Sequence, residues 1–218
     1  MLRVFTDERG AHGNPLGVFV HGGEVPAAER QPIATALNFS ETVFVDDPAA
    51  GEMRIHTPVS ELPLAGHPLV GTAWLLLSLG YGTQVLRPPA GEVPVWREDE
   101  ETWFRAKPEW APPWRMQRLA SPAEVESHPP PGPDSLLYVW AWEDEDAGRV
   151  RSRCFPTEAG IEEDQATGSA AMRLVSELAI PITIRQGKGS ILMARPGQGE
   201  TAEVGGRVVL DEERDWPL

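Results

Sequence analysis

Cysteine is almost absent from this chain of 218 residues, and positive charge is scarce. The one cysteine, Cys154, cannot form a disulfide within the chain, which is typical of proteins from a reducing compartment. Only 19 Lys and Arg stand against 33 Asp and Glu, so the formal net charge is −14. A protein that binds a nucleic-acid backbone needs a basic face, and we therefore expect no DNA or RNA partner. A small acidic ligand is still compatible with this charge, because one local site can differ from the mean.

Long apolar runs and the common cofactor motifs are missing as well. Residues 1–7 do not resemble a signal peptide, and the most apolar helix-like stretch, 73–79, is far shorter than the ~20 residues that span a bilayer. We therefore predict a cytoplasmic protein that does not enter a membrane. The sequence has no G-x-G-x-x-G after a strand, no P-loop, no G-x-S-x-G and no C-x-x-C. Its five histidines show no H-x-x-x-H spacing, so we predict no metal site.

What the chain does contain is 41% hydrophobic residues, enough for a packed core, together with 22 Pro and eight Trp. Strand and helix patterns are interleaved, but without the rhythm of parallel crossovers. We predict strands over 2–5, 16–20, 41–45, 53–56, 92–96, 102–106, 136–142, 150–155, 180–185 and 191–194, and helices over 26–37, 68–80, 122–126 and 168–179. A Pro/Trp-rich linker over 107–113 predicts two halves, 1–107 and 108–218. We expect the last segment to pack back on the first half.

Two segments of the chain follow the same plan. The stretch His56-Thr57-Pro58 leads through an acidic loop to the small residues of 66–73, and Cys154-Phe155-Pro156 leads in the same way to 164–171. Each segment has the pattern of a strand, a proline, a loop and the start of a helix rich in small residues. Such a repeat predicts two similar halves with a binding site between them. The alternative is a chance match, because Pro, Gly, Ala and Ser are common in this sequence.

The two predicted helix starts suggest what that site binds. The first N–H groups of a helix have no partner in the helix and carry a partial positive charge, so they attract carboxylates. Small residues such as Gly and Ser let a ligand approach the backbone closely. Two helix starts that face one cleft could therefore hold a small acid without any basic side chain.

Three side chains near these features are candidates for proton chemistry. Glu41 opens an apolar strand, where burial would raise the pKa of its carboxyl toward a useful range, although it could equally be a surface residue. His67 lies at a predicted helix start and would be neutral there, or it is an exposed capping residue. Asp164 precedes the second helix start and serves either catalysis or capping. Cys154 lies within a strand pattern and is expected to be a small buried residue, not a nucleophile.

Four short motifs occur in a characteristic order: 13–15 (GNP), 37–42 (LNFSET), 61–68 (ELPLAGHP) and 163–170 (EDQATGSA). Together they resemble the phenazine-biosynthesis-like (PhzF-like) isomerase family, and 186–187 and 194–196 are similar to late strands of that family. The resemblance covers most of 1–105 and about 150–196. Between Pro108 and Val150 the second half is shorter than the family pattern.

The resemblance implies an α+β fold of the diaminopimelate-epimerase type: two pseudo-symmetric halves, each a curled mixed or antiparallel sheet around a central helix. It also implies a site in the cleft between the halves, no metal or organic cofactor, and a homodimer. The best-understood member isomerises a dihydro-hydroxyanthranilate by proton transfer. The residue that matches Glu41 is its acid/base, those that match His67 and Asp164 line the cleft, and those that match Gly66 and Ser169 lie near the substrate.

We therefore predict an isomerase that acts on a small carboxylic acid, with Glu41, His67 and Asp164 as catalytic residues. The predicted substrate-binding residues are Asn14, Gly66, Thr167, Gly168 and Ser169. The alternative is a catalytically inactive protein of the same fold that binds a small acid or serves as an interaction protein. A racemase with two facing thiols is disfavoured, because the repeat places Gly66 and Asp164 at the equivalent positions.

Overall fold

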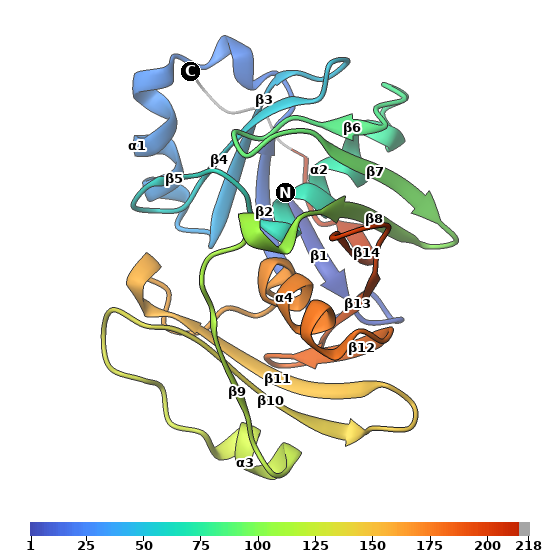
Figure 1. Ribbon diagram of the computed structural model, residues 1–218. Coiled ribbons are helices and arrows are strands. Elements are labelled where there is room, and N and C mark those ends of the chain that lie inside the picture. Colours follow the sequence, from blue (N-terminus) through green and yellow to red (C-terminus); the bar gives the residue numbers. More distant parts are fainter. Residues whose placement is uncertain (214–218) are drawn as a thin grey trace.

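The computed structural model describes residues 1–213 and contains one large mixed sheet and four α-helices within that range (Figure 1). The strands are β1 (Leu2–Thr6), β2 (Asn14–Phe19), β3 (Glu41–Asp47), β4 (Glu52–His56), β5 (Glu61–Leu62), β6 (Val85–Leu86), β7 (Val93–Glu98), β8 (Glu101–Ala106), β9 (Arg115–Arg118), β10 (Leu136–Asp144), β11 (Arg149–Pro156), β12 (Ile182–Gln186), β13 (Ser190–Pro196) and β14 (Ala202–Leu210). The helices are α1 (Ala27–Leu37), α2 (Gly66–Ser78), α3 (Pro122–Ser127) and α4 (Gly168–Leu178), with short 3-10 turns η1 (Gly22–Glu24), η2 (Pro108–Trp110) and η3 (Thr157–Ala159).

The two halves share one order of elements. In the first half, β2 and β3 are parallel and joined through α1, β3 and β4 are antiparallel, and α2 leads into the antiparallel β6, β7 and β8. In the second half, β9 and β10 are parallel and joined through α3, β10 and β11 are antiparallel, and α4 leads into the antiparallel β12, β13 and β14. In the first half, Glu52 of β4 forms a parallel bridge with Arg87, which directly follows β6; in the second half, β11 and β12 pair in parallel. This correspondence confirms the predicted α+β class with two pseudo-symmetric halves.

The last strand joins the halves. β14 pairs with β13 of the second half and with β8 and β1 of the first half, and Figure 1 shows it beside β8 and β1. The sequence pattern did not predict β14, because Gly205 and Gly206 interrupt it. A Cβ at Gly205 would lie 2.3 Å from the Trp103 ring, and one at Gly206 would lie 2.5 Å from the Phe5 ring, so the packing requires both glycines. The division at residue 107 stays a prediction, and residues 214–218 lie outside the described residues.

The central helices form the core of each half. Leu69, Val70, Ala73 and Leu76 of α2 are fully buried, and this helix contacts β1, β2, β3, β7, β8 and β14. A helix that is apolar on most of its circumference is typical of a protein interior. The second central helix, α4, packs its buried face on β13 and β14. None of the helices found in residues 1–213 is both long and apolar enough to cross a membrane.

Candidate active site

A cavity of about 290 Å³ lies between the two halves, at the starts of both central helices. Its lining includes the polar side chains of Glu41, His67 and Asp164 and the apolar side chains of Leu64 and Trp114. The structure brings seven of the eight predicted site residues to this cavity: Glu41, Gly66, His67, Asp164, Thr167, Gly168 and Ser169. The eighth, Asn14, lines a neighbouring cavity of about 280 Å³.

The two helix starts contact each other through their first glycines. A Cβ built on Gly66 would lie 2.5 Å from the Cα of Gly168, so only glycine allows the backbones to approach this closely. The residues that precede the helices, Ala65 and Thr167, provide no side-chain cap. The first N–H groups of α2 and α4 therefore receive no hydrogen bond from an N-cap side chain, and the cavity lies beside both helix starts.

Glu41, the first residue of β3, is buried beside His67. Glu41 is 9% exposed, and its Oε2 lies 3.4 Å from Nε2 of His67. The two atoms do not form a hydrogen bond. Burial, together with the nearby charge of Asp164, raises the pKa of the Glu41 carboxyl to about 8, and a hydrogen bond with Ser40 opposes this rise. The interpretation of Glu41 as a surface residue is therefore wrong, and its carboxyl is mainly protonated at neutral pH.

His67 is 2% exposed, so the alternative of an exposed capping residue is also wrong. Burial lowers the pKa of its imidazole to about 3, while a backbone interaction with Pro15 acts in the opposite direction. The ring is neutral at physiological pH. Its Nδ1 lies 3.4 Å from the Asn14 amide nitrogen, so His67 touches Glu41 with one ring nitrogen and Asn14 with the other.

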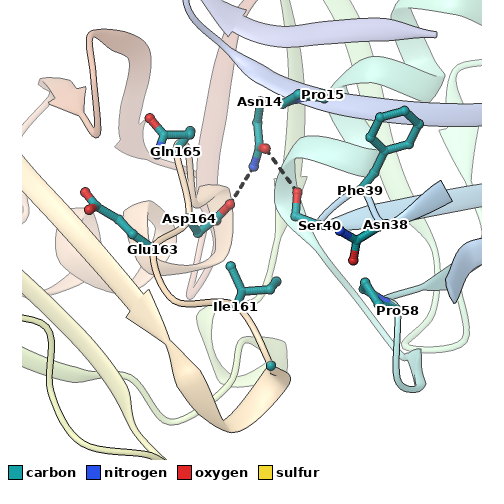
Figure 2. A pocket seen from close by; sticks show the side chains of 11 residues that line it. Asn14, Pro15, Asn38, Phe39, Ser40, Pro58, Ile161, Glu163, Asp164 and Gln165 are labelled. Carbon is teal, nitrogen blue, oxygen red and sulfur yellow. Dashed lines mark hydrogen bonds between the residues drawn. The ribbon is translucent and has the colours of Figure 1, made fainter. Parts of the chain in front are cut away.

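Asp164 accepts two short hydrogen bonds, one from the other half and one from its own loop. Asn14 Nδ2 donates to Oδ1 at 2.6 Å, as Figure 2 shows, and Thr167 Oγ1 donates to Oδ2 at 2.5 Å. Burial raises the pKa of Asp164 to about 6, and these hydrogen bonds keep it from rising further. Both oxygens of Asp164 accept hydrogen bonds, whereas Oε2 of Glu41 has no hydrogen-bond partner, so the surroundings favour the ionised form at Asp164 and the protonated form at Glu41.

Four further residues belong to the site, although the sequence analysis did not assign them to it. Ser40 Oγ donates to Asn14 Oδ1 at 3.0 Å. Trp114 Nε1 donates to the Ser169 hydroxyl at 3.1 Å, and both of these residues line the first cavity. Gln186 lines neither cavity but donates hydrogen bonds to Asp164 and Thr167, and Ile161 lines both cavities. Trp114 directly follows the Pro/Trp-rich linker 107–113, and the composition of this region gave no signal for its place in the site.

Figure 2 shows the second cavity, which Asp164 also lines. It lies between Asn14, Phe39 and Ser40 of the first half and the loop that follows β11 in the second. Asp164 and Ile161 belong to both cavities, so these two residues form the wall between them. The Asn14–Asp164 hydrogen bond therefore joins the halves between two hollows of one cleft.

Within residues 1–213 there is no group of three or more His, Cys, Asp or Glu side chains that could hold a metal ion. Cys154 is fully buried in the core, as predicted for a small buried residue. Burial raises the pKa of its thiol well above the usual value, which disfavours the thiolate that a nucleophile requires.

Fold and site together define a two-lobed α+β protein with a buried pair of carboxyls, Glu41 and Asp164, between its lobes. The family model of the phenazine biosynthesis-like proteins matches residues 2–125. This chain belongs to that family.

Relatives with known names support this placement. The chain is 32% identical over 210 residues to a trans-2,3-dihydro-3-hydroxyanthranilate isomerase of Pseudomonas aeruginosa, a match that covers 77% of this chain and 74% of the relative. It is 52% identical over 64 residues to the enzyme of the same name from Pseudomonas fluorescens, but there the match covers only 28% of this chain and 23% of the relative. Most of that second relative is therefore unmatched. A putative phenazine biosynthesis PhzC/PhzF protein of Clostridium difficile shares the fold with a TM-score of 0.82, at 21% identity, over 100% of this chain and 98% of that one.

Proposed function

We propose that this protein isomerises a small carboxylic acid by proton transfer in the cavity between its halves, without a cofactor. Glu41 is the general acid/base, and His67 and Asp164 complete the catalytic group. The observation that carries the proposal is the unbroken series of contacts from Glu41 through His67 and Asn14 to Asp164, beside two helix starts without side-chain caps.

The helix starts provide the site for the substrate carboxylate. Gly66 and His67 of α2, and Gly168 and Ser169 of α4, line the cavity with backbone N–H groups that the helices leave unpaired. The Ser169 hydroxyl, held by Trp114, adds a side-chain contact at the same end. This arrangement binds an anion in a protein of net charge −14 without using Lys or Arg.

The electrostatics favour Glu41 as the group that moves the proton. A pKa of about 8 lets Glu41 both release and accept a proton near neutral pH, which is the range in which general acid/base catalysis is most efficient. The neutral ring of His67 contacts its carboxyl without neutralising it. The ionised Asp164 raises the pKa of Glu41 and so keeps the proton available for delivery to carbon.

The names of the relatives suggest the first compound to test, trans-2,3-dihydro-3-hydroxyanthranilate, followed by a panel of small cyclic amino and hydroxy acids. Family membership also leads us to propose that the protein is a cytoplasmic homodimer. Sedimentation of the purified chain would test the oligomeric state.

The decisive assay follows the conversion of each acid by NMR with the wild type, Glu41→Gln and Glu52→Gln. Glu52 is an exposed carboxylate on the neighbouring strand β4, so it controls for the loss of a charge. We expect Glu41→Gln to slow conversion by about 10²-fold or more, because a positioned acid/base contributes on that order. Conversion that survives Glu41→Gln would refute the assigned role. Tight binding of an acid without conversion of any panel member would favour the alternative, a small-acid binding protein without catalysis.

A further inference from the structure

Gln186, the last residue of β12, is fully buried and lines neither cavity. Its side chain nevertheless forms three hydrogen bonds to residues that do. Nε2 donates to the backbone oxygen of Asp164 at 2.9 Å and to Thr167 Oγ1 at 2.8 Å, and Oε1 accepts from the backbone N–H of Thr167 at 3.2 Å.

These partners fix the orientation of the Gln186 amide. A backbone carbonyl can only accept a hydrogen bond, and a backbone N–H can only donate one. Nε2 must therefore face the carbonyl of Asp164, and Oε1 must face the N–H of Thr167. The second hydrogen of Nε2 is then directed at the Thr167 hydroxyl oxygen.

The orientation of Gln186 determines the direction of the next hydrogen bond. A hydroxyl has one hydrogen, and because Thr167 Oγ1 accepts from Gln186, its own hydrogen is free to go to Asp164 Oδ2 at 2.5 Å. The Cys154 thiol also interacts with Thr167, but a thiol is a weak acceptor that competes poorly with a carboxylate.

The other oxygen of Asp164 is constrained in the same way. Asn14 Nδ2 lies 3.2 Å from the backbone oxygen of Ala166, which can only accept, so the nitrogen of this amide and not its oxygen must face Asp164 Oδ1 at 2.6 Å. Both oxygens of Asp164 thus receive hydrogens from neighbours, and such hydrogen bonds favour the ionised form.

We propose that Gln186 is a positioning residue of the site: by donating to the Thr167 hydroxyl, it directs that hydroxyl onto Asp164 and holds Asp164 as the anion of the carboxyl pair. The remaining proton then resides on Glu41. The significance of this for catalysis rests on the proposed function, whereas the hydrogen-bond relay itself does not depend on any reaction.

The surroundings of the relay are defined. The titratable and charged groups around Asp164 are Glu41 of β3, His67 of α2, Tyr138 of β10, Arg151 and Cys154 of β11, and Glu163. The buried Arg151 guanidinium donates to the backbone oxygens of Arg185 and Gly187, on either side of Gln186. The position of Gln186 is therefore fixed through the backbone of its two chain neighbours as well as through the hydrogen bonds of its own side-chain amide.

The test measures the titration of the Asp164 carboxyl by ¹³C NMR in the full chain labelled at aspartate Cγ, with Asp164→Asn to assign the signal. In Gln186→Glu, the new carboxyl can still accept from the Thr167 N–H, but once it is ionised it cannot donate, so the Thr167 hydroxyl turns toward it and leaves Asp164. Because the site is fully buried, the ionisation of the new carboxyl is followed in a parallel sample labelled at glutamate Cδ, and the Asp164 midpoint is compared only where that carboxyl is ionised. Where it stays protonated, the comparison of Thr167→Val with Thr167→Ser decides. We expect the midpoint of Asp164 to rise by about one pH unit. Thr167→Val should raise it in the same direction, and Thr167→Ser, which keeps the hydroxyl, should leave it near the wild-type value.

The double variant Gln186→Glu with Thr167→Val is the matched control for added charge, because it has the same new carboxylate but no hydroxyl to redirect. We expect Gln186→Glu to raise the midpoint much less in that background than in the wild type. An unchanged midpoint in Gln186→Glu, or an equal rise in both backgrounds, would overturn the proposal. Should Gln186→Glu fail to fold, equal midpoints in Thr167→Val and Thr167→Ser would overturn it. No substrate is needed, so this result is independent of whether the protein proves to be an isomerase.

Discussion

Replacing Glu41 by Gln should stabilise the fold while it abolishes activity, and the gain should grow with pH. The pKa of this carboxyl is about 8 in the folded protein and close to 4.5 in the unfolded chain. A raised pKa in the folded state means that stability is full below pH 4.5 and falls as the pH rises toward 8, because only the unfolded chain ionises in that window. Each unit of pKa shift corresponds to about 1.4 kcal/mol, so the cost approaches about 5 kcal/mol above pH 8 and is about 3 kcal/mol at pH 7.

Gln has the shape of the protonated carboxyl and does not ionise, so Glu41→Gln removes this cost. Urea unfolding of both proteins at pH 5, 7 and 8.5 measures the difference in the free energy of unfolding. We expect nearly equal stability at pH 5 and an advantage for Glu41→Gln of about 3 kcal/mol at pH 7, with a further increase at pH 8.5. Asp164 is present in both proteins, and the part of the Glu41 shift that comes from its charge is lost with the Glu41 carboxyl and is included in the measured difference. A difference that does not change with pH, or one that favours the wild type at pH 8.5, would show that Glu41 ionises normally and would refute the reasoning.

Three further predictions concern the surroundings of Glu41. The pKa of His67 is lowered to about 3, so its contribution to wild-type stability is full above pH 6.5 and is lost as the pH drops toward 3. Between these pH values, His67→Gln should make the fall in the free energy of unfolding shallower by up to about 1.4 kcal/mol per pH unit. An unchanged slope would contradict the burial of a neutral ring. Gly66→Ala should cost about 1–3 kcal/mol in thermal unfolding because its Cβ would overlap the other helix start, whereas Gly132→Ala, which meets nothing within 4 Å, should be neutral; equal effects would argue against the close contact. Trp114→Phe removes the N–H that holds the Ser169 hydroxyl and should raise KM by up to about tenfold with little change in kcat, whereas a loss confined to kcat would contradict a role in binding.

Local signals in the sequence predicted much of the fold. Helix α1 ends where Asn38 adopts the left-handed conformation, with φ of 53°, and Asn is one of the few residues that favour this conformation at a helix end. The repeated plan of strand, proline, loop and helix start predicted both central helices. These features depend on neighbours in the chain, so a sequence pattern can report them.

The parts that could not be predicted depend on contacts between distant residues. Strand β14 contains Gly205 and Gly206, which oppose a strand by propensity and are required only because Trp103 and Phe5 pack against them. Trp114 contacts the site through a hydrogen bond to Ser169, and nothing in the sequence around Trp114 indicates that partner.

The candidate site likewise has a part that the sequence predicted and a part that it did not. Its carboxylates and helix starts could be named from motifs. The hydrogen bonds that set their charge run through Asn14 and Gln186, which are far from Asp164 in the chain and are brought to it only by folding.

The most direct test of the central claim, that Glu41 carries the proton to the substrate, is the source of that proton. In heavy water the Glu41 carboxyl of the free enzyme holds a deuteron derived from solvent, because it is protonated at neutral pH. We expect ¹H and ²H NMR to show deuterium at the carbon that is protonated in the acid converted by the wild type, at the same rate in Glu52→Gln, and about 10²-fold more slowly or not at all in Glu41→Gln. Labelling at the wild-type rate in Glu41→Gln would contradict the claim.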